Sequence, residues 1–230
     1  MLHSSLDQQK SRTLAADVYV RLRGDIVWCR LMPGTALRFE SMKETYGASF
    51  TTLREALTAL VADGLVVSEG QRGFRVAPVT RADLVDLTDA RVLIERQLIR
   101  LAIEKGGDDW EVAASAAFHR MTLVLQRHGT KVSTMPEWKL VHGQFHHALV
   151  AASGAPTLLA IRDKLYDRAE RYRSLGSLFG KRAESKAPEH KSILDAALAR
   201  NVERAQSLID KHIRATTTVL LTKADVAFED

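Results

Sequence analysis

Two histidines spaced four residues apart are the strongest candidates for chemistry in this chain of 230 residues. His142 and His146 lie in a segment with helical periodicity, where residues i and i+4 project from the same face. Two imidazole rings that project together can bind one divalent cation, because neutral ring nitrogens are common ligands for zinc, copper, iron and nickel. The spacing therefore predicts part of a metal site on one helix.

Two further histidines lie on the inward stripes of other predicted helices. His190 is in line with Leu194 and Leu198, and His212 is in line with Ile209. Four imidazoles that converge inside a helical bundle would bind zinc, nickel or another divalent ion that prefers imidazole. The alternative is four separate core histidines bonded to backbone carbonyls. The spacing leaves both interpretations open, because it constrains only the pair on one helix.

A second group of residues has the types and spacing of side chains that contact DNA bases. Ser49, Thr51 and Arg54 come at the start of an amphipathic helix whose leucines recur at the spacing of one buried face. A helix-turn-helix places the N-terminal residues of its recognition helix against base edges in the major groove, where small polar and guanidinium side chains are wanted. We therefore predict base contacts from this end of the helix.

The elements around these residues follow the order of a winged helix. The periodicity predicts helices over residues 14–26 and 39–46 before the recognition helix, and two short strands over 65–67 and 74–76 after it. The turn between the strands contains two glycines and has Arg72 at its tip. A small helical domain whose hairpin only covers its core is the alternative interpretation.

Beyond residue 77, the sequence pattern predicts helices and no strands. Pro78 stiffens the exit from the wing, and Thr80 can cap the next helix over Asp83. The predicted fold is mainly α, with an N-terminal winged helix-turn-helix and a C-terminal all-α six-helix bundle. The predicted helices of the bundle are Arg81–Glu104, Asp108–Arg127, Met135–Ala152, Pro156–Leu178, Ser185–Arg200 and Val202–Lys223. The predicted domains are a disordered tail (1–12), the winged helix-turn-helix (13–77), a hinge (78–80), a helical effector, metal-binding and dimerisation domain (81–223) and a second tail (224–230).

Composition favours a cytoplasmic protein that contains no membrane segment. No run of eighteen apolar residues occurs, and the N-terminus lacks the apolar core of a secretion signal. The single cysteine, Cys29, excludes an internal disulfide. The net charge is +5, but residues 1–80 hold ten basic against eight acidic side chains. Affinity for DNA would therefore come from the placement of charges.

The first eighty residues resemble the GntR family of bacterial transcription regulators. The resemblance is carried by Pro33-Gly34, Leu37-Arg38, the run Arg54-Glu55-Ala56-Leu57, Asp63-Gly64-Leu65 and Arg72-Gly73. It implies contacts with double-stranded DNA from Arg38, Ser49, Thr51, Thr52, Arg54, Arg72 and Gly73. One position departs from the family pattern, because Phe50 stands where the family usually has an arginine. We therefore expect a different operator sequence.

The helical domain resembles the FCD ligand-sensing domain of the FadR subfamily. The resemblance is carried by residues 89–95, the Phe145-His146 and Glu189-His190 steps, residues 151–154 and His212. It implies a divalent metal, zinc or nickel for example, held by an aspartate and three histidines. The histidines match His146, His190 and His212, and His142 replaces the aspartate. Residues 103–110 and 169–173 look most like the carbon-starvation-induced, glutarate-responsive regulators of the family.

The metal ligands predict an anionic effector. Four neutral imidazoles leave the charge of a divalent ion uncompensated, so a carboxylate or dicarboxylate should be drawn to it. Arg91, Arg171 and Tyr172 are candidates to clamp the other end of this effector, since guanidinium groups suit carboxylates. Interhelical or surface salt bridges, such as one from Arg171 to Asp167, are the alternative for these arginines.

The leading hypothesis is a homodimeric repressor, not an enzyme, that binds a pseudo-palindromic operator under the control of this effector. The rival hypothesis is a metal-dependent hydrolase or lyase that uses the histidines with Glu189 as base. However, the chain has no HExxH motif, nucleophile elbow, phosphate-binding loop or dinucleotide fingerprint. A third hypothesis is a regulator whose metal is purely structural.

Overall fold

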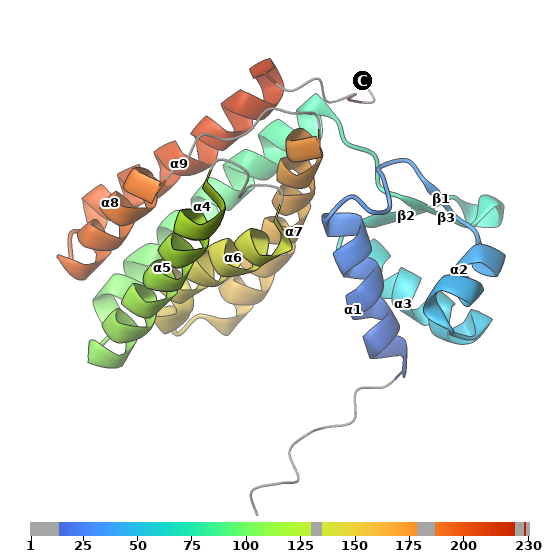
Figure 1. Ribbon diagram of the computed structural model, residues 1–230, viewed down its shortest axis with the longest axis horizontal. Coiled ribbons are helices and arrows are strands. Elements are labelled where there is room, and N and C mark those ends of the chain that lie inside the picture. The colour runs from blue at the N-terminus through green and yellow to red at the C-terminus, as the bar shows by residue number, and fades with distance from the viewer. Residues whose placement is uncertain (1–13, 130–134, 179–186, 224–227, 229–230) are drawn as a thin grey trace, which may run out of the picture. The chain divides into compact units, whose positions relative to one another are not determined.

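The computed structural model describes residues 14–129, 135–178, 187–223 and 228. The chain divides into two compact units, residues 1–78 and 79–230. The fold is mainly α, as predicted: the first unit is a winged helix-turn-helix with a small sheet, and the second is a helical bundle (Figure 1). Residues 1–12, all of 224–230 except residue 228, and the predicted helix start at Ser185 lie outside the described residues.

The first unit packs three helices against a three-stranded sheet. Leu22, Ile26, Leu53, Leu57 and Leu60 are completely buried in its core, which confirms the predicted apolar faces of the first and third helices. The elements are α1 (Leu14–Val27), β1 (Ala36–Leu37), α2 (Phe39–Tyr46), α3 (Phe50–Ala62), β2 (Val66–Ser68), the 3-10 turn η1 (Gly70–Arg72) and β3 (Phe74–Val76).

The sheet has the order β1-β3-β2, and both pairings are antiparallel. The β2–β3 hairpin is the predicted wing, and Val66 lies opposite Val76 in its register. Strand β1 was not predicted, because two residues are too short to show a period. It forms because Leu37 is buried and lies opposite Phe74, which satisfies backbone groups along the free edge of β3.

The turn between α2 and α3 gives the helix-turn-helix its shape. Gly47 ends α2 with a φ of 64°, a left-handed conformation that favours glycine. Two residues later, the Oγ atom of Ser49 accepts a hydrogen bond from the backbone N–H of Thr52 at 3.3 Å and caps α3. The first turn of α3 is thereby fixed at its N-terminus.

Within its described residues, the second unit contains the six helices that the sequence predicted. Thr80 caps α4, as predicted, since its Oγ1 accepts from the Asp83 backbone N–H at 3.0 Å. A 3-10 turn, η3 (Ala151–Ser153), follows α6. The α-helices are α4 (Arg81–Lys105), α5 (Asp108–His128), α6 (Pro136–Val150), α7 (Pro156–Leu178), α8 (Ala187–Leu198) and α9 (Val202–Lys223).

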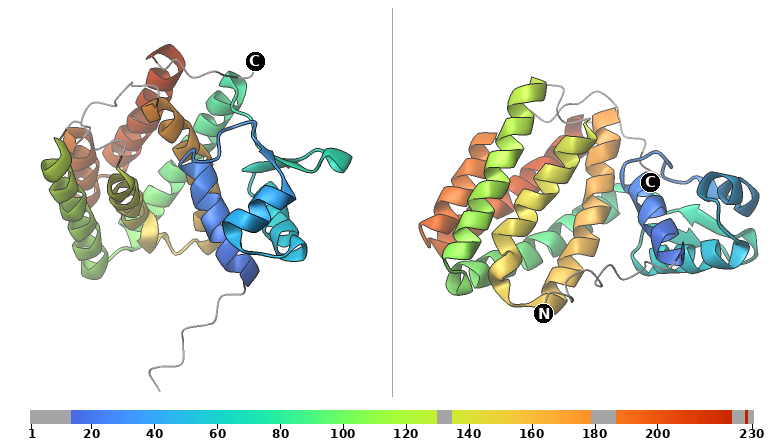
Figure 2. Two further views of the ribbon diagram at one scale, coloured as in Figure 1. Left: turned by 45° about the vertical axis from the view of Figure 1, so that its right-hand side comes forward. Right: turned by 60° about the horizontal axis from the view of Figure 1, so that its bottom comes forward.

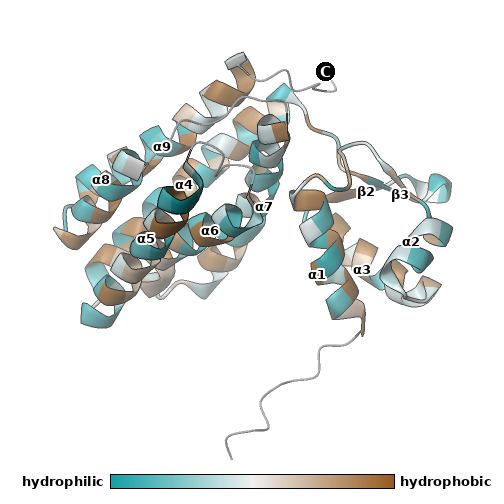
Figure 3. Ribbon diagram, viewed as in Figure 1, coloured by the Kyte–Doolittle hydropathy of each residue, from teal (hydrophilic) through white to brown (hydrophobic). Residues whose placement is uncertain are grey.

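The core of the second unit is shared by all of its helices. Helix α4 packs along α7 and α9, α5 packs along α6, and α8 packs along α9 (Figure 2). Each helix carries both hydrophilic and hydrophobic residues, as helices with one buried face do (Figure 3). Leu98, Phe145, Ala197 and Ile209 are among the buried residues. Among the described helices, none has the length and apolar character needed to cross a membrane.

Candidate metal centre and nucleic-acid interface

Four histidines from three helices meet inside the second unit. His142 and His146 come from α6, His190 from α8 and His212 from α9. All four are buried, and one nitrogen of each ring lies within 4.8 Å of the corresponding nitrogens of the others. The four predicted ligands therefore form one cluster and are not separate core histidines.

The spacing of the ring nitrogens fits a shared metal ion. The Nε2 atom of His142 lies 3.1 Å from Nε2 of His190 and 3.2 Å from Nε2 of His146. Two nitrogens on a tetrahedral zinc ion, each bonded at about 2.05 Å, would be about 3.3 Å apart. A single ring nitrogen has either one proton or one lone pair, so it cannot make two good hydrogen bonds at once. A cation shared by the four rings would bind a nitrogen lone pair of each ring.

Burial keeps the two α6 histidines neutral, which is the form that binds metal. Burial lowers the pKa of His142 and of His146 well below 6.5, and the neighbouring histidines lower both further. The aromatic ring of Phe145 covers the cluster from one side, with centroids 5.4 Å from His146 and 5.5 Å from His190. His142 and His146 are therefore buried and neutral at pH 7.

Two of the rings have a partner on Nδ1. Nδ1 of His142 lies 3.1 Å from the hydroxyl oxygen of Tyr166, and Nδ1 of His212 lies 2.9 Å from a carboxylate oxygen of Glu189. Such partners fix the ring and place the proton on the bonded nitrogen, which leaves the other nitrogen for the metal. Sequence reasoning missed Tyr166 and gave Glu189 only a catalytic role.

Three arginines surround the ring of Tyr166. The guanidinium carbons of Arg162 and Arg173 each lie 4.8 Å from the ring centroid, and that of Arg91 lies 5.6 Å from it. Cation–π contacts of this kind hold both the ring and the charges. Because the Tyr166 hydroxyl contacts His142, the three guanidinium groups around its ring place three positive charges near the four histidines.

Two glutamates neutralise part of this charge. Glu95 accepts a hydrogen bond from Nε of Arg162 at 3.0 Å, and Glu170 binds Arg173. Among the described residues, the buried Nε of Arg91 and the buried Nη2 of Arg162 have no hydrogen-bond partner. Burial lowers the pKa of Arg91 to about 10, and the charge of Arg173 lowers it as well. Buried donors without acceptors, in a net positive cluster, indicate a place for an anion.

The three residues predicted to clamp an effector do not lie together. Arg91 belongs to the cluster around Tyr166. Tyr172 donates its hydroxyl hydrogen to Asp83 at 2.6 Å and accepts from the backbone N–H of Thr80, so these contacts lie at the start of α4. Arg171 is 1% exposed, and its guanidinium lies 5.8 Å from the Tyr172 ring. The structure thus brings only Arg91 to the histidines.

Sequence reasoning missed Arg162 and Arg173 as residues near the metal site. The signal was present, because residues 162, 166 and 173 recur along α7 at helical spacing and place polar groups on one stripe, in which Arg162 and Tyr166 are buried. A buried stripe of charged and aromatic residues indicates partners on neighbouring helices, but it does not name them.

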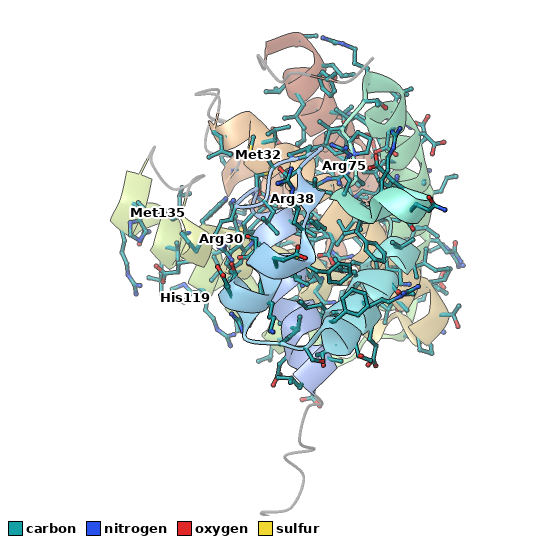
Figure 4. All side chains as sticks on the ribbon, turned by 90° about the vertical axis from the view of Figure 1, so that its right-hand side faces the viewer. Arg30, Met32, Arg38, Arg75, His119 and Met135 are labelled. Carbon is teal, nitrogen blue, oxygen red and sulfur yellow. The ribbon has the colours of Figure 1, made fainter. Side chains whose placement is uncertain are left out.

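The predicted DNA-reading residues lie on the first unit. Thr52 and Gly73 are half-buried, and Arg38, Ser49, Thr51, Arg54 and Arg72 are exposed. Arg38 precedes α2, and Arg72 and Gly73 end the turn of the wing. Ser49 caps α3, and Thr51, Thr52 and Arg54 lie in its first turns. Phe50 is 54% exposed and packs on Phe39 with ring centroids 4.3 Å apart. Arg30, Arg38 and Arg75 of this unit are labelled in Figure 4.

Comparison with protein families decides the identity of both units. Residues 14–76 match the bacterial regulatory proteins of the gntR family, and residues 86–215 match the FCD domain. The chain belongs to the GntR family and carries an FCD domain. In this GntR protein, the helix-turn-helix and wing fall in the first match, and the four histidines fall in the second.

Relatives of this GntR protein are transcription regulators. The HTH-type transcriptional repressor GlaR of Escherichia coli is 36% identical over 201 residues, which is 86% of this chain and 91% of GlaR. The HTH-type transcriptional regulator BphR of Paraburkholderia xenovorans is 35% identical over 210 residues, which is 91% of this chain and 86% of BphR. The solved structure of E. coli McbR/YncC has the same fold, with a TM-score of 0.79 at 20% identity over 92% of this chain and 99% of McbR.

Proposed function

We propose that this GntR regulator is a cytoplasmic, homodimeric repressor of transcription whose affinity for a pseudo-palindromic operator is set by a small dicarboxylate effector. The observation that carries the proposal is the buried four-histidine cluster next to Arg91, Arg162 and Arg173, within the FCD domain of a chain that also has a winged helix. The name of GlaR supports repression.

DNA binding is assigned to the exposed first turn of α3 and to the wing. Thr51 and Arg54 present a hydroxyl and a guanidinium, and a bidentate arginine contact with guanine is a common specific contact in the major groove. Ser49 caps α3, so its hydroxyl positions the helix as well as facing the DNA. Arg38 and Thr52 lie beside these residues. Arg72 and Gly73 in the wing approach the minor groove.

Arg54→Ala tests this assignment. A DNA site is first selected from a random duplex library with the wild-type protein, and its affinity is then measured by fluorescence anisotropy at fixed salt. The variant should lose affinity worth about 1–3 kcal/mol and relax the preference at one base pair in each half-site. Arg100→Ala is the control, because Arg100 pairs with Glu104 on the surface of α4. Unchanged affinity and preference in Arg54→Ala would reject the recognition helix.

The metal is assigned to His142, His146, His190 and His212, with zinc or nickel as the preferred ions. A divalent ion bound there would supply positive charge and, if it accepts more than four ligands, a position for a carboxylate oxygen. Arg91 and Arg162 offer their unpartnered donors to the second carboxylate of the effector. Arg171 and Tyr172 stay as predicted contacts that a larger effector would reach.

Metal analysis of the double variant His146→Ala/His190→Ala tests the site. The purified wild-type protein should carry about one ion per chain, and the double variant should carry none, because two of four ligands are gone. His119→Ala is the control, since His119 is an exposed histidine on α5 (Figure 4). Equal metal content in the double variant and the wild type would reject the site.

A thermal-shift screen tests the effector. Dicarboxylates of four to six carbons, glutarate among them, should raise the melting temperature only in the metal-loaded protein, because ligand binding stabilises the folded state by mass action. The same compounds should have no effect after treatment with a chelator. A shift in melting temperature that persists after treatment with the chelator would show that the effector binds without the metal.

A purely structural metal is the second candidate. It is favoured by one observation: four histidines already complete a tetrahedral set, and structural zinc sites are closed in this way. Here the chelator alone should lower the melting temperature of the helical unit, and no dicarboxylate should change it in the metal-loaded protein.

A further inference from the structure

The hydroxyl group of Tyr166 touches the metal cluster from outside. Its oxygen lies 3.1 Å from Nδ1 of His142, and both side chains are buried. Among the residues that the structure describes, His142 is the only hydrogen-bond partner of this hydroxyl. The hydroxyl therefore bonds to His142 alone among the four histidines. His142 is also the one that stands where the family resemblance predicts an aspartate.

The direction of this hydrogen bond decides whether His142 can bind a metal. A neutral imidazole carries its proton on either Nδ1 or Nε2. With the proton on Nδ1, the ring donates to the Tyr166 oxygen and keeps a lone pair on Nε2, the atom that faces His146 and His190. With the proton on Nε2, the ring accepts from the tyrosine and cannot bind a cation. A tyrosine hydroxyl can serve as either donor or acceptor, so it suits the site before and after metal binding.

The surroundings hold Tyr166 in this place. The guanidinium groups of Arg91, Arg162 and Arg173 contact its ring. A Cβ atom at Gly143, the residue after His142, would lie 3.4 Å from the hydroxyl oxygen, so the hydroxyl lies directly against α6.

We infer that Tyr166 is a positioning residue for His142: it accepts the Nδ1 proton, orients the ring, and so presents Nε2 to the metal. The inference rests on the proposed metal site. It gives the tyrosine the role that carboxylates and backbone carbonyls have behind other metal-binding histidines. Aspartate, which has no ring to orient, would not require this partner in the same form.

The test is a double-mutant cycle read out as zinc affinity. Tyr166→Phe keeps the ring and removes the hydroxyl, and it should weaken zinc binding roughly tenfold to a hundredfold in competition with a chelator. In the His142→Ala background, where three histidines stay, the same change should have an effect of less than about twofold, because the ring that Tyr166 orients is gone. Cobalt(II) provides a second readout, since the visible absorption band should change shape in Tyr166→Phe.

Tyr46→Phe is the matched control. It also removes the hydroxyl of a buried tyrosine, but this hydroxyl belongs to α2 of the first unit and donates to Asp25 at 2.6 Å. Zinc affinity should stay within about twofold of the wild type, while the melting temperature falls. Equal losses for Tyr166→Phe in both backgrounds, or no loss in either, would overturn the inference. Failure of the wild-type protein to bind zinc or cobalt at all would instead overturn the proposed metal site.

Discussion

A carboxylate oxygen of Glu189 lies 2.9 Å from Nδ1 of His212, one of the four clustered histidines. Glu189 begins α8 and His212 lies in α9, so the contact also joins two helices. A carboxylate that accepts the proton of one ring nitrogen raises the basicity of a histidine and fixes its tautomer, which leaves the other nitrogen for a metal. This is the place of an orienting residue, and it differs from the place of a general base beside a metal-bound water.

Removal of this carboxylate should weaken the metal site. Glu189→Ala is expected to lower zinc affinity about tenfold to a hundredfold, because His212 loses the acceptor for its Nδ1 proton. Chelator competition at pH 7 measures the change. Glu104→Ala is the control, since Glu104 pairs with Arg100 on the surface of α4. Equal zinc affinity in the two variants would contradict the assigned role.

Acid should destabilise the metal-free helical unit. Burial lowers the pKa of His142 and His146 below 6.5, so between those lowered values and 6.5 the unfolded chain binds protons that the folded chain does not. The free energy of unfolding should therefore fall as the pH decreases below about 6.5, by at most about 1.4 kcal/mol per pH unit for each histidine.

Urea denaturation at pH 7, 6 and 5 measures this slope. In a Trp28→Phe background, the fluorescence of Trp110 and Trp138 reports on the helical unit alone. The variant His142→Gln/His146→Gln should show a flatter dependence on pH, because it lacks the two groups. A slope as steep as that of the wild type would assign the acid sensitivity to other residues.

The operator preference should depend on Phe50. This side chain begins α3 and is 54% exposed, in the turn that we assign to base contacts. Phe50→Arg adds a guanidinium that can bind guanine, so sites selected from a random library should gain a guanine in each half-site. Val20→Ala, which changes an exposed residue of α1, should leave the selected sequence unchanged. Identical sites for Phe50→Arg and the wild type would place Phe50 away from the bases.

The junction between α4 and α5 should not tolerate a side chain at Gly106. A Cβ atom there would lie 2.4 Å from the indole ring of Trp110 and 2.7 Å from the backbone oxygen of Ala102. Gly106→Ala should therefore cost about 1–3 kcal/mol of stability in thermal or urea denaturation. Gly107→Ser is the control, because a Cβ there meets nothing within 4 Å and serine is a good N-cap for α5. It should be neutral or stabilising.

Local patterns in the sequence predicted most of the elements of both units. Helices such as α4 and α9 were predicted because apolar residues recur once per helical turn over more than twenty residues. The helix cap at Thr80 and the wing between β2 and β3 were predicted because helix starts and turns need particular residue types. Strand β1 was missed, since two residues become a strand only through their partner.

The residue patterns alone predicted the fold class, the helix-turn-helix with its wing, and a pair of histidines on one helix face. The packing of the helices then showed that all four histidines meet, with Tyr166 and Glu189 bonded to two of them. It also placed Arg162 and Arg173 beside Arg91, and Tyr172 beside Asp83. The physical reason is the range of the interactions. Periodicity and capping act within one or two turns of the chain, whereas a metal site is formed by side chains from α6, α8 and α9, which only helix packing brings together.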